Sequence, residues 1–271
     1  MRKKLLWFVG GLLVALIALA GAYKVGVNEY SKKGGLILEY HSVGYENWDK
    51  SLVVRPKVFE RHLQLLQEGG YKVVTVAQLT ERLRKGQSVD KYVALSFDDG
   101  YKSNRTYALP LMQKYNAKGT FLLVNRLIGS SDMYMNEQEV KEMVAAGMEI
   151  GSHTFSHNPL ADIDPKYLEW EIATSQYDLE RRFPGALVRT MAFPCGSYNP
   201  KILALLKRYG YEQALTGHTG MITHEYYQQH PMELYRLIIQ DNGTGPMAFV
   251  GMLKRGYRHS YLRTFGIDLG D

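Results

Sequence analysis

From residue 34 onward, short apolar runs alternate with segments of helical periodicity, and this alternation limits the possible folds more than any other feature. The runs are apolar at consecutive positions, as strands buried on both faces are. Candidate strands lie at 36–40, 72–76, 92–97, 120–124, 148–152, 190–194, 213–217 and 235–239. The order predicts an α/β fold, a distorted (β/α) barrel with about seven parallel strands.

The helices between these strands carry recognisable start signals. Pro56, Pro165 and Pro200 each stand at the first position of an amphipathic segment, where the missing N–H has no cost. Asn136 followed by Glu139 predicts a capping box. No repeat or Pro-rich linker interrupts the pattern, so we expect one domain.

The N-terminal segment 1–23 differs from the rest of the chain. Its stretch 5–23, LLWFVGGLLVALIALAGAY, contains no charge, and as a helix it is about 28 Å long, close to the thickness of a bilayer core. We favour a transmembrane anchor. A buried core helix and a signal peptide are the alternatives, since small residues near the end of the stretch are compatible with cleavage. Those small residues are Ala18, Ala20 and Ala22.

Three cations precede this stretch, and cations stay on the cytoplasmic side of a membrane. The domain is therefore expected to be extracytoplasmic, anchored to the membrane or secreted after cleavage. The predicted organisation is the N-terminal helix, a linker at 24–33, the barrel at 34–258 and a C-terminal tail at 259–271 that lies on the surface.

Composition excludes two classes of protein. The formal net charge is +6, and Arg2, Lys3 and Lys4 supply half of it. The remaining bias is too weak for a nucleic-acid partner, and no basic run interleaved with aromatics is present. The single cysteine, Cys195, excludes a disulfide scaffold. We expect Cys195 to be a small, buried apolar residue rather than a nucleophile or a metal ligand.

Two adjacent carboxylates follow the strand at 92–97. Asp98 and Asp99 in the stretch ALSFDDG stand at its C-terminal end, where β/α barrels carry their chemistry. Adjacent residues diverge in direction, so the two carboxylates can do different work. Their mutual repulsion costs free energy unless a cation is bound beside them. A metal ion is the simplest such cation.

Two histidines follow the strand at 148–152. In the stretch GSHTFSH, His153 and His157 are four residues apart, which on a helical turn brings both imidazoles to the same side. Together with Asp99 they make a set of two histidines and one carboxylate. This set predicts one divalent ion, zinc in the first place, with cobalt, nickel or manganese as alternatives.

These motifs, together with GTFLLV and MAFPCGSYNP, resemble in order and spacing the polysaccharide deacetylases, which are metal-dependent carbohydrate esterases. The stretches LEYHSVG and ELYRLII look most like the branch of exported poly-N-acetylglucosamine deacetylases. The similarity spans about residues 35 to 245. It implies an acetylated glycan as the substrate.

The resemblance also implies roles for particular residues. Asp98 would be the general base, while Asp99, His153 and His157 would bind the metal. An N–H of the FPCG turn, that of Cys195 next to Pro194, would stabilise the oxyanion.

The proton donor and the residue that orients the base are less clearly marked. His41 ends the first strand and is the favoured donor, with His218 as an alternative; we expect His62, His224, His230 and His259 on the surface. Many family members carry an arginine where this chain has Ala192. Arg189 or Arg236 is expected to replace it.

Three functions are consistent with the sequence. The first is an N-deacetylase that acts on a β-linked N-acetylglucosamine polysaccharide, either exopolysaccharide or peptidoglycan. The second is an O-acetyl esterase acting on xylan-type glycans, and the third is a noncatalytic glycan-binding module. The complete set of Asp98, Asp99, His153 and His157 argues against the third. The sequence does not predict an oligomeric state.

Overall fold

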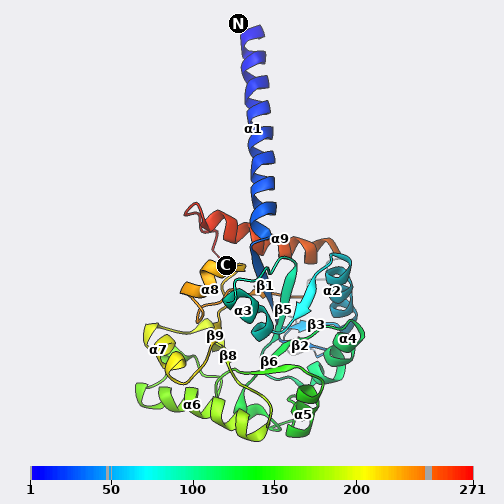
Figure 1. The fold of residues 1–271 in the computed structure, drawn as a ribbon. Coiled ribbons are helices and arrows are strands. Elements are labelled where there is room, and N and C mark those ends of the chain that lie inside the picture. Colours follow the sequence, from blue (N-terminus) through cyan, green and yellow to red (C-terminus); the bar gives the residue numbers. More distant parts are fainter. Residues whose placement is uncertain (1, 47–48, 50, 242–245, 271) are drawn as a thin grey trace.

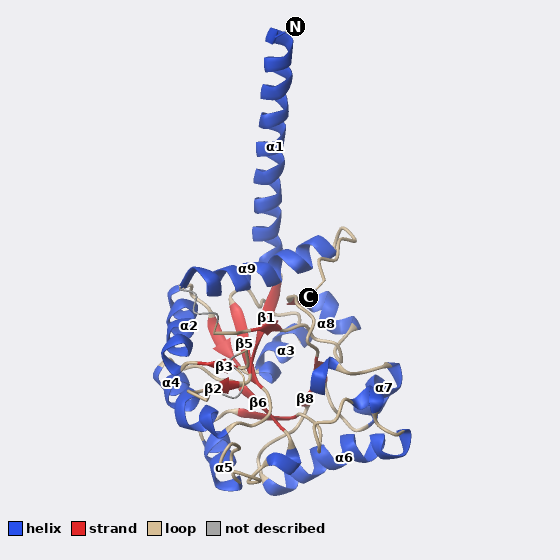
Figure 2. Cartoon of the chain, turned by 180° about the vertical axis from the view of Figure 1, so that it is seen from behind, coloured by secondary structure: helices blue, strands red, loops and turns tan. Residues whose placement is uncertain are grey.

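The computed structural model describes residues 2–46, 49, 51–241 and 246–270, and for residues 2–14 and 246 the backbone only. A curled, mostly parallel sheet is covered by helices (Figures 1 and 2). The strands are β1 (Gly34–Tyr40), β2 (Ser42–Val43), β3 (Val53–Val54), β4 (Lys72–Val74), β5 (Tyr92–Phe97), β6 (Thr120–Leu123), β7 (Glu149–Ser152), β8 (Thr190–Ala192), β9 (Gln213–Leu215), β10 (Ile222–Thr223) and β11 (Leu237–Ile238). The α-helices are α1 (Arg2–Ser31), α2 (Pro56–Glu68), α3 (Val76–Arg84), α4 (Leu109–Lys114), α5 (Glu137–Ala145), α6 (Pro165–Arg182), α7 (Pro200–Arg208), α8 (His224–Gln229) and α9 (Pro246–Arg263).

The main sheet follows the order β1-β5-β6-β7-β8-β9, with every neighbouring pair parallel. β4 adds to the first half of β5, and β10 pairs antiparallel with β1, which the sequence did not predict. The segment 234–238 lies between β1 and β9, the two strands at the ends of this order. Leu237 pairs with Leu38 of β1, and Leu234 forms an isolated bridge with Leu215 of β9. The predicted barrel is thus a curled sheet whose last gap is crossed by one short segment.

Successive residues of β1 belong to different parts of the core. Leu36, Leu38 and Tyr40 pack in the cluster that includes the apolar faces of α2 and α6, while Ile37 packs in a second cluster with residues of β5, β6, β8 and β9. We call these the outer and the inner cluster. Alternation of this kind follows from the period of two in a strand. The continuous apolar runs therefore reflect strands covered on both faces.

Local capping explains why the predicted strand 72–76 ends at Val74. The side chain of Thr75 accepts a hydrogen bond from the N–H of Gln78, and the Gln78 side chain accepts one from the N–H of Thr75. This capping box begins α3 at Val76, whose side chain joins the inner cluster. The interior is therefore filled by α3 as well as by strand residues.

The helix start signals are confirmed. α2, α6 and α7 begin at the three predicted prolines. At α5, the Asn136 side chain accepts from the N–H of Glu139 (2.9 Å), and the Glu139 side chain accepts from the N–H of Asn136 (2.9 Å). Of these helices, α5, α6 and α7 connect consecutive parallel strands of the main sheet, which fixes the strand ends at one edge of the sheet.

α1 leaves the domain next to the first residue of β1 (Figure 1). The helix continues to Ser31, so the predicted linker at 24–33 is mostly helical. Its last turns pack on α9, where Tyr30 and Tyr261 have ring centroids 5.7 Å apart. Within the described part of the chain, no helix has the length and apolarity needed to cross a membrane. Met1 and the side chains of residues 2–14, on which the predicted span depends, lie outside that part.

The predicted boundary at residue 258 falls inside α9. Tyr257, His259 and Ser260 are buried against the domain, so this part of the C-terminal segment is not the expected surface appendage. His259 was expected on the surface, and so was His62, which is also buried. An amphipathic α9 explains both cases, since one face of this helix covers the sheet and α2.

His62 lies in the interface between α2 and α9. Its ring stacks on Phe249 with centroids 4.1 Å apart, and Nδ1 lies 3.1 Å from the hydroxyl of Tyr40. Burial lowers the pKa of His62 to about 4. The imidazole is therefore neutral in the folded protein at pH 7.

We expect His62 to make stability depend on pH. In the unfolded chain the imidazole binds a proton near pH 6.5, whereas the folded protein binds it only near pH 4. The unfolded state binds more protons between these values, so the free energy of unfolding falls as the pH falls, by about 3 kcal/mol for this group. In H62Q, which keeps an acceptor for Tyr40, the decrease between pH 7 and 4 should be smaller by that amount in denaturant unfolding. H230Q, at an exposed histidine, is the control, and an unchanged pH dependence in H62Q would contradict the assignment.

Candidate active site

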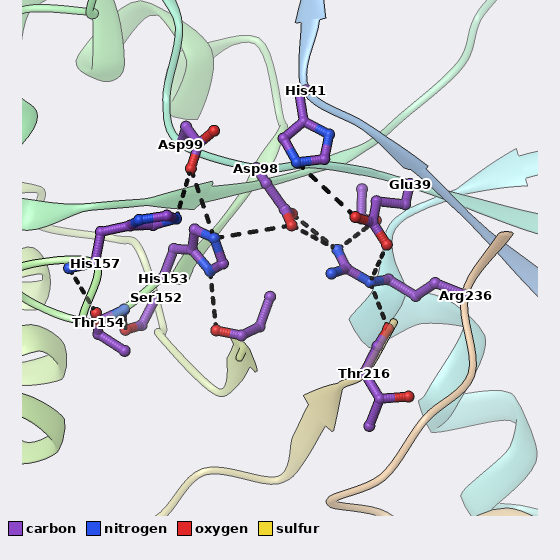
Figure 3. A network of polar contacts seen from close by, with 12 residues as sticks. Glu39, His41, Asp98, Asp99, Ser152, His153, Thr154, His157, Thr216 and Arg236 are labelled. Atoms are coloured by element: carbon purple, nitrogen blue, oxygen red, sulfur yellow. Dashed lines mark hydrogen bonds and ion pairs between the residues drawn. The ribbon is translucent and has the colours of Figure 1, made fainter. Parts of the chain in front are cut away.

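Polar side chains gather at the carboxyl ends of the parallel strands (Figure 3). Asp98 directly follows β5, and its N–H donates to the carbonyl of Tyr40 at the end of β1 (2.9 Å). His153 directly follows β7, and its N–H donates to the carbonyl of Leu123 at the end of β6 (2.8 Å). The sheet pairing thus continues into the site and places both side chains at the same edge.

The three predicted metal ligands converge. His157 Nε2 lies 3.2 Å from Asp99 Oδ1, and His153 Nε2 lies 3.6 Å from the same oxygen. One ligand atom from each residue lies within 4.8 Å of the other two. His153 Nδ1 lies 2.9 Å from the carbonyl oxygen of Ala192, so a proton on Nδ1 donates there and leaves the Nε2 lone pair for a metal. Two imidazoles and one carboxylate fit a divalent first-row ion.

The loop that carries the histidines is not the helical turn that their spacing predicted. Thr154 and His157 both have a φ of 65°, and the N–H of His157 donates to Thr154 Oγ1 (3.0 Å). From α6, the carboxylate of Glu171 accepts hydrogen bonds from the N–H groups of Phe155 (3.1 Å) and Ser156 (3.0 Å). These bonds stabilise an irregular loop that points both imidazoles toward Asp99.

The adjacent carboxylates have different partners. Asp99 has a φ of 72°, a left-handed conformation that is uncommon outside glycine, although Asp adopts it more readily than most residues. Asp99 faces both histidines, while Asp98 contacts Arg236 on one side and lies 3.9 Å from His153 Nε2 on the other (Figure 3). This divergence explains how two like charges can follow one strand.

Arg236 holds Asp98 with a short pair of contacts. Arg236 Nη1 lies 2.8 and 2.9 Å from the two carboxylate oxygens of Asp98, and Nε donates to the carbonyl of Thr216 (2.9 Å). Nε also lies 3.0 Å from Glu39 Oε2. Asp98 and Arg236 are each only 2% exposed. A guanidinium buried to this degree needs carboxylate partners to stay charged at acceptable cost.

The charges of the site determine its protonation. Burial acts to raise the pKa of Asp98, but the charges of Arg236 and His153 outweigh it and hold that pKa below its ordinary value. Burial also opposes ionisation of Asp99, yet its pKa lies well below the ordinary range because His157 hydrogen-bonds it. The same bond raises the pKa of His157. Both carboxylates are therefore ionised at neutral pH.

The remaining predicted residues are placed differently from one another. His41 follows β1, and its Nε2 lies 3.9 Å from Glu39 Oε1 with the side chain 17% exposed. Pro194 is buried, whereas Cys195 is exposed and has a φ of 54°. The expectation of a buried Cys195 is therefore wrong, because the turn after β8 directs this residue outward.

Of the two arginines, only Arg236 contacts Asp98. Arg189 precedes β8 and so lies at the opposite end of the sheet, where Nη1 is 2.8 Å from Glu180 Oε1. His218 is exposed, and its carbonyl oxygen accepts the N–H of Arg236 (2.9 Å). His218 thus supports the backbone of the segment that carries Arg236.

Three residues of the site were not predicted. Glu39 and Thr216 contact Arg236, and Glu171 stabilises the histidine loop. Glu39 left a signal in the sequence, since it is the one charged residue of the apolar strand LILEY. Thr216 acts through its backbone carbonyl, and Glu171 lies among several charged residues of a helix, so neither is marked by its type.

Comparison with known proteins agrees with this geometry. The family model described as polysaccharide deacetylase matches residues 85–214, which include the aspartates and the histidines. The chain is 32% identical to YxkH of Bacillus subtilis over 185 residues, which make up 68% of this chain and 64% of YxkH. It is 23% identical over 256 residues to a poly-beta-1,6-N-acetyl-D-glucosamine N-deacetylase of Staphylococcus aureus, and the match covers 84% of each protein.

Solved structures share the fold. The Streptococcus pyogenes deacetylase PplD, solved in complex with acetate, superposes with a TM-score of 0.74 at 25% identity, covering 82% of this chain and 98% of PplD. IcaB of Ammonifex degensii superposes with a TM-score of 0.68 at 21% identity, covering 83% and 97%. With its fold, its ligand set and these matches, the chain belongs to the polysaccharide deacetylase family.

We predict that the protein binds about one divalent ion per chain and that H153A weakens the affinity more than about 100-fold, because loss of a ligand costs more than loss of a supporting contact. Titration of the metal-free protein with zinc, followed by calorimetry, measures this. H230A, at an exposed histidine, is expected to bind like the wild type. Equal affinity in H153A would remove His153 from the ligand set.

Proposed function

We propose that this protein removes N-acetyl groups from a β-linked N-acetylglucosamine polysaccharide outside the cytoplasm. The observation that carries the proposal is that two adjacent carboxylates occupy different positions in the site. Asp99 faces His153 and His157, while Asp98 is held by Arg236 at the edge of the same site. One carboxylate is thus a ligand, and the other is available for proton transfer.

The ligand set would supply a Lewis acid to the site. A divalent ion held by Asp99, His153 and His157 polarises an acetamide carbonyl and makes water more acidic. Asp98 is ionised and fixed, so it takes a proton from the water that adds to the carbonyl carbon. The C–N bond then breaks, with acetate and an amine as the products.

The amine leaves with a proton from a general acid, and His41 is our candidate. His41 directly follows β1 and Asp98 directly follows the neighbouring β5, and the His41 side chain is reached by solvent. Its Nε2, a carboxylate oxygen of Glu39 and one of Asp98 lie within 4.8 Å of one another. We assign the oxyanion contact to the N–H of Cys195, in the turn that follows β8.

The substrate class rests on the relatives. The Staphylococcus aureus relative is named for poly-β-1,6-N-acetyl-D-glucosamine, and PplD is a deacetylase that was solved with acetate bound. An N-acetylated polymer is accordingly the substrate proposed here, with zinc as the ion. Acetyl xylan serves as the competing substrate in the test below.

We predict that the wild-type protein with zinc releases acetate from N-acetylglucosamine oligomers and that D98N lowers the rate by about 100-fold or more, because the amide cannot accept the proton. Zinc content should stay near one ion per chain in D98N. Acetate release is measured enzymatically, with and without chelator, on N-acetylglucosamine oligomers and acetyl xylan.

The matched control is D90N, which makes the same change just before the other end of β5. It is expected to retain wild-type activity. Acetate release from acetyl xylan but not from N-acetylglucosamine oligomers would contradict the proposed N-deacetylation and indicate an O-acetyl esterase instead. Glycan binding without acetate release from any substrate would favour a binding module.

The extracytoplasmic location rests on the N-terminal sequence, in which three cations precede a long uncharged stretch. We predict that external protease digests the protein on intact cells stripped of their wall, or that the protein is found in the medium if the segment is cleaved. A cytoplasmic marker enzyme is the control. Recovery of the whole protein with that marker would contradict the location.

A further inference from the structure

The interior face of β1 carries a buried carboxylate directly below the site. Glu39 is 5% exposed and lies between Ile37 of the inner cluster and His41 at the strand end. In the ladder it stands opposite Ser96, two residues before Asp98 on β5. A charged residue in this layer needs a specific partner, because burying an isolated carboxylate costs several kcal/mol.

The partner of Glu39 is Arg236, and the contact is one of charge rather than of an aligned hydrogen bond. Glu39 Oε2 lies 3.0 Å from Arg236 Nε, but the Nε hydrogen is directed to the carbonyl of Thr216. Among the described residues, Oε2 accepts no hydrogen bond. Oε1 lies 3.9 Å from His41 Nε2. Glu39 thus faces Arg236 with one oxygen and His41 with the other (Figure 3).

Two carboxylates and an imidazole form a set that a metal ion can use, since ligand atoms of Glu39, His41 and Asp98 lie within 4.8 Å of one another. A cation is already present there. Arg236 places Nη1 on both oxygens of Asp98 and Nε beside Glu39. A divalent ion in this position would meet the guanidinium at close range, so this set is an ion cluster of the protein rather than a second metal site.

The two carboxylates fix the guanidinium from two sides. Asp98 binds it at Nη1, Glu39 lies at Nε, and the carbonyl of Thr216 limits its rotation. Burial raises the pKa of the Glu39 carboxyl, and the charge of Arg236 opposes that rise. Without this carboxyl group, the guanidinium would be held by Asp98 at one end and by a neutral carbonyl at the other. Its position, and with it that of the Asp98 carboxylate, would be less restrained.

We propose that Glu39 is a positioning residue that fixes Arg236, and through Arg236 the carboxylate of Asp98, for proton transfer. This role rests on the proposed function, in which Asp98 is the general base. Among the described residues, the buried carboxylate of Glu39 contacts Arg236 and His41, and no contact with Asp99, His153 or His157 is seen. Its loss should therefore affect turnover rather than substrate affinity or metal content.

The test compares kcat, KM and zinc content in E39Q, R236Q and the double variant. E39Q keeps the shape of the side chain and removes its charge, and we expect kcat to fall about 10- to 100-fold, the loss typical of a displaced catalytic group. KM for N-acetylglucosamine oligomers and zinc content should stay within about twofold. If Glu39 acts through Arg236, the double variant should have the kcat of R236Q, because interacting residues are not additive.

E149Q is the matched control, since Glu149 is a carboxylate on β7 that accepts hydrogen bonds from Ala77 and Thr120 away from the site. It should keep wild-type kcat even if its melting temperature falls. E39D retains the charge and is expected to recover kcat at least about threefold relative to E39Q. If E39Q does not fold, the test rests on E39D. A kcat below that of the wild type at unchanged KM would then support the role of Glu39, and a wild-type kcat would contradict it.

The role of Glu39 would be overturned if E39Q had the kcat of the wild type. It would also be overturned if E39Q lowered kcat by the same factor in the R236Q background as in the wild type. Either result would leave the deacetylase proposal intact. A zinc-loaded wild-type protein that releases no acetate from any glycan would instead overturn the proposed function, and this role with it. The two failures are therefore distinguished by the wild-type measurement alone.

Discussion

The buried guanidinium of Arg236 is the interaction on which the arrangement of the site depends. It lies between Asp98 and Glu39, two carboxylates that would otherwise share an interior with no compensating charge. With Arg236 in place, Asp98 stays ionised, and Asp99 is the carboxylate that lies close to both histidines. Removal of Arg236 would leave two unpaired buried charges, a loss that in proteins costs several kcal/mol of stability.

The strands make this arrangement possible through their period of two. Residues of β1 and β5 that face the interior are apolar near the strand starts, as Ile37 and Ala94 are, and become polar toward the strand ends, at Glu39 and Ser96 and then His41 and Asp98. The apolar layers below fix the strand positions by packing, so the polar side chains above them project from a rigid backbone. The site is thus the last layer of a packed interior.

The sequence predicted the parts of the structure that depend on local patterns. The alternation of strands and helices, the proline starts of three helices, the Asn136 capping box and the convergence of Asp99, His153 and His157 follow from spacing and strand ends. The antiparallel β10 and the burial of His62 and His259 depend on tertiary packing, which local spacing does not encode. The helical turn expected for the histidine loop is wrong, because the N–H groups of Phe155 and Ser156 donate to Glu171, which lies in a different element and holds the loop in an irregular shape.

The position of Arg236 has a consequence for how such chains are compared. The family resemblance places an arginine at position 192, but the arginine that contacts Asp98 here is Arg236, 44 positions further along the chain, in the segment that lies between β9 and β1. A column-by-column alignment would score Ala192 as a lost residue and the enzyme as degenerate. Only the arrangement in space shows that a guanidinium still reaches Asp98, because a curled sheet brings more than one stretch of polypeptide to the same interior point.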